Sequence, residues 1–426
     1  MSPGRRFIRA VSSKTVLSLV DQVVVSGTRF ATTVMIGRFG SEAELGVYSL
    51  AFSIVVLVLS FQESLISIPY TVFVKRLNES DQSSYAGSTL VQAICLNLIA
   101  SAMLIVCCIG LITFEIAPGL PWILAILAVL LPFMLIREFA RRYAFAHLDM
   151  RTVLSLDIGV SVFQLAGLAL LVWSQDMTAV GTYLVTGVAS ALGALAWIGL
   201  SRSSFRWNRD RAISDVAKNW KFGKWVAGAH IISVMHMYLA HWMLVAVYDE
   251  KSTGIFSACM TVVVLANPFI LGVTNVLSPK VAHLYVESGA EAVAKKVWQF
   301  CGLMSAVLIT FAVFASIFGG RFIVFVFEKN YAGNDLAIAV LAFGTVALGI
   351  SYSVAGGLRA IDRPETNLWA GIVGLIVTGI VSSLLITSLE ILGTTIGLVA
   401  GFYAMAAYRT VAFQWFIKHP PLSAQI

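Results

Sequence analysis

Residues 82–136 read QSSYAGSTLVQAICLNLIASAMLIVCCIGLITF, then Glu115, then IAPGLPWILAILAVLLPFMLI, so a single charge separates two long uncharged runs. A helix needs about 20 mostly apolar residues to cross a bilayer, and both runs are long enough. Over its 426 residues the chain is 58% hydrophobic and 12% charged, whereas a soluble domain has roughly 25% charged residues. We therefore expect an all-α polytopic membrane protein.

Comparable uncharged runs follow along the rest of the chain, at 158–175, 177–201, 225–248, 252–279, 297–320, 336–358, 367–389 and 391–408. Two further spans, at 15–37 and 44–74, are interrupted by charged residues. The sequence thus predicts about twelve transmembrane helices.

Lysine and arginine placement predicts the orientation of these spans. With the N-terminus inside, the cytoplasmic segments collect 24 of the 29 basic residues, and the outer loops keep only Arg38, Lys251, Arg321 and Lys329. Basic residues accumulate in cytoplasmic loops. We expect a multi-pass protein of the bacterial inner (cytoplasmic) membrane with both termini in the cytoplasm.

The longest loop, which is strongly basic, follows the sixth span and divides the chain into a six-helix lobe at 1–200, a cytoplasmic linker at 201–224 and a six-helix lobe at 225–426. The halves share short matches in the same order: Leu45-Gly46-Val47-Tyr48-Ser49 corresponds to Thr253-Gly254-Ile255-Phe256-Ser257, and Ile68-Pro69 to Ser278-Pro279. This pattern predicts a parallel repeat about an axis along the membrane normal, with a central cavity and alternating access.

Polar residues gather on one side of the first span. Asp21, Thr28, Arg29 and Thr32 fall within about 100° of each other on a helix, and the opposite side is apolar. Because a charge at mid-membrane costs at least about 2.5–3.5 kcal/mol, we expect this side to face a cavity.

The second span carries Glu63 and Gln62 near its middle. Glu63 is the natural candidate partner for Arg29. The pair is interpreted either as a substrate or coupling-ion site or as a structural ion pair between two helices.

The fourth span ends in Arg137, Glu138, Arg141 and Arg142. Arg137 and Arg141 share a face, where they could bind a phosphate or act as topology markers; we favour the second interpretation and keep Arg141 as a pathway candidate.

No metal site, catalytic residue or nucleic-acid surface is predicted. The five cysteines lie in apolar runs without a CxxC pair, and His230, His236 and His241 lack metal-ligand spacing, which favours interhelical hydrogen bonds or cavity lining. The stripe of Gly393, Gly397 and Gly401 predicts close helix packing.

The stretch from Asp21-Gln22 to Gly37-Arg38-Phe39-Gly40, followed by Leu45-Gly46-Val47-Tyr48-Ser49 and Ile68-Pro69, resembles the polysaccharide-export (Wzx-like) flippases of the multidrug/oligosaccharidyl-lipid/polysaccharide exporter superfamily. This resemblance implies two six-helix lobes forming a V-shaped cavity that moves undecaprenyl-linked sugars across the membrane. By position it implies Arg29 as a headgroup contact and Asp21 as an ion-coupling or charge-balancing group. The seventh span lacks the basic residue that some flippases carry there.

The predicted function is therefore transport of lipid-linked oligosaccharide or polysaccharide precursors. The predicted partners are the lipid bilayer and polysaccharide assembly machinery, and we expect no cofactor beyond a coupling proton or sodium gradient. The alternatives are a multidrug or cation exporter of the same superfamily, or a membrane polymerase or ligase. The short outer loops argue against an enzyme.

The charge asymmetry makes a topology prediction. Reporter fusions after Ser203 and after Gly333 should report opposite compartments, because an odd number of predicted spans separates the two positions. The same compartment for both fusions would contradict the span count.

Overall fold

The computed structural model describes residues 3–113, 119–207 and 209–419, and these form helices joined by short turns, with no strand among them. Helices satisfy every internal backbone N–H and C=O within one segment, as a lipid environment demands. The all-α class predicted from the sequence is confirmed. The chain divides into two compact units, Met1–Ile231 and Ile232–Ile426, each with its own packing.

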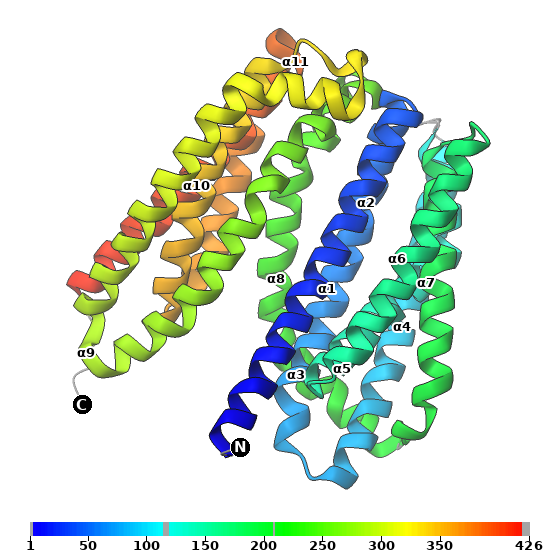
Figure 1. The fold of residues 1–426 in the computed structure, drawn as a ribbon, viewed down its shortest axis with the longest axis vertical. Coiled ribbons are helices and arrows are strands. Elements are labelled where there is room, and N and C mark those ends of the chain that lie inside the picture. Colours follow the sequence, from blue (N-terminus) through cyan, green and yellow to red (C-terminus); the bar gives the residue numbers. More distant parts are fainter. Residues whose placement is uncertain (1–2, 114–118, 208, 420–426) are drawn as a thin grey trace. The chain divides into compact units, whose positions relative to one another are not determined.

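Unit 1 (Met1–Ile231) contains most of the separate helices in Figure 1. They are α1 (Pro3–Phe39), α2 (Glu42–Gln62), the π-helix η1 (Glu63–Ser67), α3 (Ile68–Phe73), η2 (Val74–Arg76), α4 (Glu79–Thr113), α5 (Leu120–Ala146), α6 (Met150–Trp173), α7 (Ala179–Ser201), η3 (Arg202–Ser204) and the first part of α8 (Arg209–Val247). Within this unit α1 packs on α6, and α5 packs on both α4 and α7.

Side-chain caps fix where several of these helices begin. Asp149 starts α6 by accepting a hydrogen bond from the Thr152 N–H, and Thr178 starts α7 by accepting one from Gly181. The hydrogen bond from the Thr152 hydroxyl lowers the pKa of the exposed Asp149 carboxyl. Glu44 of α2 also caps the N-terminus of α7, because its carboxylate accepts a hydrogen bond from the Ala179 N–H at 2.5 Å. Such caps satisfy donors that a helix leaves open at its N-terminus.

The second predicted span is continuous from Glu42 to Arg76 but contains the π-helix η1, which begins at Glu63. Pro69 lies just after this segment and has no N–H to give to the preceding turn. A π-helical turn accommodates one extra residue and shifts the side chains around it. Glu63 therefore stands at an irregular point of its helix.

Unit 2 (Ile232–Ile426) contains the rest of α8, followed by α9 (Glu250–Phe327), η4 (Lys329–Tyr331), α10 (Asp335–Ala360) and α11 (Glu365–Lys418). Helices α9 and α11 each contain one non-helical residue, Gly289 at φ 73° and Glu390 at φ 47°. Glycine adopts positive φ without strain, and in Figure 1 the ribbon of α9 reverses its direction at this turn. A core of Leu277, Val297, Leu358 and Phe413 joins α9, α10 and α11.

Nine helices among the described residues are long and apolar enough to cross a membrane, and α9 and α11 are two of them. The multi-pass character predicted from the sequence is thus present. The count of twelve stays a prediction, since it is reached only if α9 and α11 each cross twice and α1 crosses as well. The two six-helix lobes and their V-shaped arrangement also stay predictions.

Some predicted segments include residues that the structure does not describe. Positions 114 and 116–118 of the third and fourth predicted spans lie outside the described residues, as do the side chains of Arg5, Arg6, Arg9 and Lys14. The predicted linker 201–224 lies within unit 1, where much of it forms the start of α8.

The proposed repeat extends to local geometry within each unit. Ser41 starts α2 by accepting from the Glu44 N–H, and Asp249 starts α9 by accepting from Ser252. In the turns that follow α5 and α10, Leu148 and Asp362 both have φ 57°. The duplication gains support from these caps and turns, whereas the axis relating the halves stays a prediction.

The glycine stripe of α11 lies where its two segments meet. A Cβ added at Gly397 would lie 2.0 Å from Ser382 Oγ, and one added at Gly401 would lie 2.0 Å from Thr378 Oγ1. The predicted close packing is confirmed, because only glycine leaves room for these neighbours.

This packing makes a stability prediction. Gly401→Ala should destabilise the protein by about 1–3 kcal/mol, because the new methyl group overlaps Thr378 and the His236 ring. Gly302→Ala is the matched control, since no atom lies within 4 Å of its added Cβ. Thermal unfolding in detergent measures both; equal midpoints for the two variants would contradict the packing.

Candidate functional site

The polar residues of α1 lie in two different environments, one buried and one exposed. Asp21, Thr28 and Thr32 are buried inside unit 1, whereas Arg29 is exposed. Thr28 and Thr32 donate to backbone carbonyls one turn earlier, and Gln164 of α6 donates to the Thr32 hydroxyl at 2.9 Å. The predicted cavity face is therefore divided: Thr32 packs against α6, Asp21 is buried elsewhere in the unit, and Thr28 and Arg29 line a cavity.

The Arg141 guanidinium on α5 is the centre of a buried ion-pair network. It contacts Asp21 of α1 at 3.1 Å, Asp157 of α6 at 2.5 Å and Glu138 of its own helix at 2.9 Å. Asp157 is 0% exposed and Asp21 is 2% exposed. Ion pairs of this kind persist in low dielectric only when the remaining hydrogen-bonding groups find partners. Asp21 Oδ1 is buried and, among the described residues, has no hydrogen-bond partner.

Arg137 extends the network by one helical turn. It pairs with Asp157 and lies 3.8 Å from Glu138. Arg137 and Arg141 thus hold one carboxylate, Asp157, from two successive turns of α5. The snorkelling side chains expected for topology markers are wrong, because both guanidinium groups are engaged inside the helix bundle, while the topology itself stays a prediction.

The predicted pairing of Glu63 with Arg29 is also wrong. Glu63 forms its ion pair with Arg142 of α5, at the start of the π-helical turn. Arg29 instead lies over the ring of Phe52, with its Cζ 5.3 Å from the ring centroid. In the part of the chain that the structure describes, no carboxylate pairs with Arg29. An extra residue in η1 redirects Glu63, and sequence spacing alone does not reveal this rotation.

Gln62 is a packing contact between helices. Its side chain is 0% exposed and donates to the Leu135 carbonyl of α5 at 2.7 Å. Gln62 therefore ties α2 to α5.

A cavity of about 120 Å³ opens inside unit 1. Its polar lining includes Thr28, Arg29, Arg137, Glu138, Ser161, Gln164, Thr186 and Ser190, and its aromatic lining comprises Tyr48, Phe52 and Tyr183. Aromatic walls with a few polar groups are typical of sites for small amphipathic molecules. Arg29 supplies an exposed positive charge to this lining.

Of the predicted pathway residues, Thr28 and Arg29 line the cavity, while Asp21 and Arg141 meet in the adjacent network. Glu63 and Gln62 contact α5 elsewhere. The sequence reasoning missed Asp157 and Gln164. Asp157 carried a signal, because it is a lone acid immediately before the uncharged run at 158–175.

Two of the three histidines form interhelical hydrogen bonds, as predicted. In unit 1 His230 Nδ1 lies 3.0 Å from the Ser64 hydroxyl, and in unit 2 His236 Nε2 lies 3.0 Å from the Thr378 hydroxyl. The His241 ring packs edge-on against Phe256 at 4.9 Å.

Comparison with solved structures gives whole-chain matches at low identity. An inward-facing conformation of a multidrug resistance MATE family transporter of the MOP superfamily has a TM-score of 0.79 and 13% identity, over 93% of this chain and 94% of that one. An outward-facing conformation of such a transporter has a TM-score of 0.67 and 13% identity, over 96% and 95%. A MOP superfamily transporter from Pyrococcus furiosus, described as having a binding pocket of reversed polarity that suggests a different function, has a TM-score of 0.68 and 14% identity, over 96% and 95%.

The chain has the MATE fold. No protein-family model matches the sequence, and no curated protein aligns with it. The fold agrees with the superfamily that the sequence resembles. The Wzx-like subfamily stays a prediction, because similarity at this identity concerns the fold alone.

The network predicts that replacing Arg141 and replacing its neighbour Arg142 destabilise the protein by different amounts. Arg141→Met leaves Asp21 and Asp157 buried without their shared cation and should destabilise the protein by about 3–5 kcal/mol. Arg142→Met removes a pair whose side chains are 43% and 27% exposed and should cost at most about 1 kcal/mol. Chemical unfolding of both variants measures the difference; similar costs would show that Arg141 does not hold the helices together.

Proposed function

We propose that the chain is a secondary transporter that exports amphipathic organic molecules from the cell by alternating access. The observation that carries this proposal is the similarity of the fold, along nearly the whole chain, to both inward-facing and outward-facing multidrug transporters. The cavity in unit 1 has both aromatic and polar side chains in its lining, so it can contact the apolar and the polar part of such a molecule. We place the protein in the bacterial inner membrane with both termini in the cytoplasm, as the basic residues predict.

Coupling to a proton or sodium gradient forms part of the proposal. The ion-paired residues around α5 comprise four carboxylates (Asp21, Glu63, Glu138 and Asp157) and three arginines (Arg137, Arg141 and Arg142). One negative charge remains unbalanced within this set. A buried carboxylate in that position gains from binding a proton or a cation. Asp21 is the candidate, because its Oδ1 has no hydrogen-bond partner in the described structure.

A second candidate function is the transport of lipid-linked sugars. Arg29 favours it, since the carboxylates of the network are paired with other arginines whereas Arg29 presents an exposed positive charge to the cavity. An arginine in that position suits the diphosphate of a lipid-linked sugar better than a cationic drug.

Proteoliposomes with an imposed proton or sodium gradient test the function. We expect gradient-dependent movement of the cationic dye ethidium, and we expect Asp21→Asn to abolish it while the protein still folds. This variant folds because it equalises the charges of the network and keeps an oxygen that accepts from Arg141.

Arg29→Gln separates the two substrate classes. Ethidium export should persist in this variant, because no favourable contact with a cation is lost, whereas movement of an undecaprenyl-diphosphate sugar should fall about tenfold or more. Arg38→Gln, at the end of the same helix, is the control. Movement of the sugar lipid without ethidium export would replace the first candidate with the second, and movement of neither would contradict transport.

A further inference from the structure

Arg409 of α11 lies inside unit 2, although the sequence places it among the basic residues of a cytoplasmic segment. It is 8% exposed, and its Nη1 donates to the Ser351 hydroxyl of α10 at 2.7 Å and to the Ser351 carbonyl at 3.4 Å. Its Nε is buried and has no hydrogen-bond partner among the described residues. The acceptors of this buried positive charge are therefore two neutral oxygens of Ser351.

Among the described residues, the charge added near Arg409 is the positive charge of Arg359. Arg359 of α10 and His236 of α8 both lie within electrostatic range of Arg409. Across the described residues, neither Arg409 nor Arg359 forms an ion pair with a carboxylate. A buried charge without a partner is unfavourable, and two arginines within range of each other add repulsion.

The position of Arg359 in its helix explains how its positive charge is stabilised, whereas the position of Arg409 does not. Arg359 lies in the last turn of α10, where the free carbonyl groups favour a cation. Arg409 lies nine residues before the end of α11, about 13.5 Å along the axis at 1.5 Å per residue, which is beyond the reach of that effect. An anion from outside the chain would compensate its charge.

Hydroxyl groups complete the surroundings of the two arginines. Tyr352 lies within electrostatic range of both. A Cβ added at Gly356 would lie 3.9 Å from Arg359 Nη2 and 3.6 Å from the Ser278 hydroxyl of α9. These two side chains therefore lie near each other. Two guanidinium groups with nearby hydroxyls match the several oxygens of a phosphate group.

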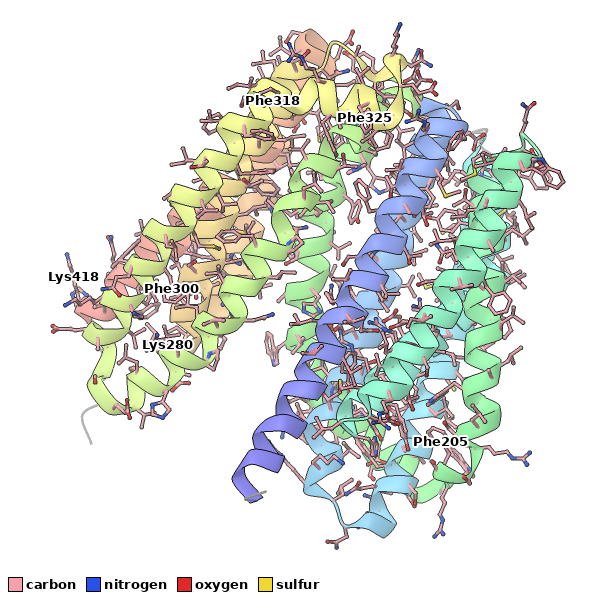
Figure 2. All side chains as sticks on the ribbon, viewed as in Figure 1. Phe205, Lys280, Phe300, Phe318, Phe325 and Lys418 are labelled. Carbon is pink, nitrogen blue, oxygen red and sulfur yellow. The ribbon has the colours of Figure 1, made fainter. Side chains whose placement is uncertain are left out.

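We propose that Arg409 and Arg359, with Ser351, Tyr352 and Ser278, bind a phosphate group. The site lies on the side of unit 2 that carries the last turn of α10, where Arg359 lies. Figure 2 shows Lys418 and Lys280 near one end of this unit, and Phe318 and Phe325 near the other. The charge asymmetry assigns the lysine end to the cytoplasm, where anionic phospholipids are concentrated. The phosphate can belong to such a lipid or to a soluble molecule.

Thermal unfolding of the purified full chain in detergent tests the site without a transport assay. Titration with phosphatidylglycerol, with phosphatidylcholine and with inorganic pyrophosphate distinguishes the sources. We expect phosphatidylglycerol to raise the unfolding midpoint more than phosphatidylcholine does. A shift with pyrophosphate as well would assign the phosphate to a soluble source, and a shift with the lipid alone would assign it to the headgroup.

Three arginine variants test whether the phosphate binds at the proposed site. Arg409→Met and Arg359→Gln should each weaken the apparent affinity about tenfold or more, because each removes charge-assisted hydrogen bonds. Arg363→Gln should bind like the wild type, since Arg363 already pairs with Glu365 at 3.6 Å and stacks on Phe416. Arg359 is exposed, so its variant keeps the test valid if Arg409→Met does not fold. Equal responses of all three variants, or no shift with any probe, would overturn the proposal.

Discussion

The contact of one guanidinium with carboxylates from two other helices sets the arrangement of unit 1. Arg141 belongs to α5, Asp21 to α1 and Asp157 to α6, so their ion pairs fix the mutual rotation of three helices. Apolar packing is nondirectional and tolerates small rotations, whereas a guanidinium requires its carboxylates within about 3 Å. The cavity beside the network depends on this rotation, because Thr28 and Arg29 reach it from the same helix that Asp21 anchors.

Hydropathy was sufficient to predict the class of fold and the approximate extents of most helices. Lipid excludes unpaired backbone groups, so an uncharged run of 20 residues has hardly any alternative to a helix. The glycine stripe of α11 was predictable for a similar reason, since small residues at i, i+4 and i+8 allow two helices to approach closely. The breaks in α9 and α11 fall between predicted spans: Gly289 lies between 252–279 and 297–320, and Glu390 is the single charge between 367–389 and 391–408. The positive φ of Glu390 is the part that the sequence does not signal.

The candidate site was only partly predictable, because helical spacing gives the angle between residues on one helix but not the identity of the facing helix. Asp21 and Arg141 were each recognised as unusual, yet their pairing spans 120 residues of sequence. Glu63 was assigned to Arg29 on the assumption of a regular second helix, and the π-helical turn at Glu63 invalidates that assumption. Sequence reasoning also did not distinguish members of the buried network, such as Arg141, from residues that line the cavity, such as Arg29.

The two units handle buried charge in different ways, and this difference bears on mechanism. In unit 1 the carboxylates slightly outnumber the arginines they pair with, a composition suited to binding a proton or cation. In unit 2 Arg409 is buried, donates to the neutral Ser351 hydroxyl and has no carboxylate partner among the described residues, a composition suited to binding an anion. A ligand stabilises whichever conformation it binds more tightly. Under the proposed function, if the two proposed sites change their exposure between inward-facing and outward-facing conformations, a cation at Asp21 and an anion at Arg409 would each bias the same equilibrium, and neither would need direct contact with the other.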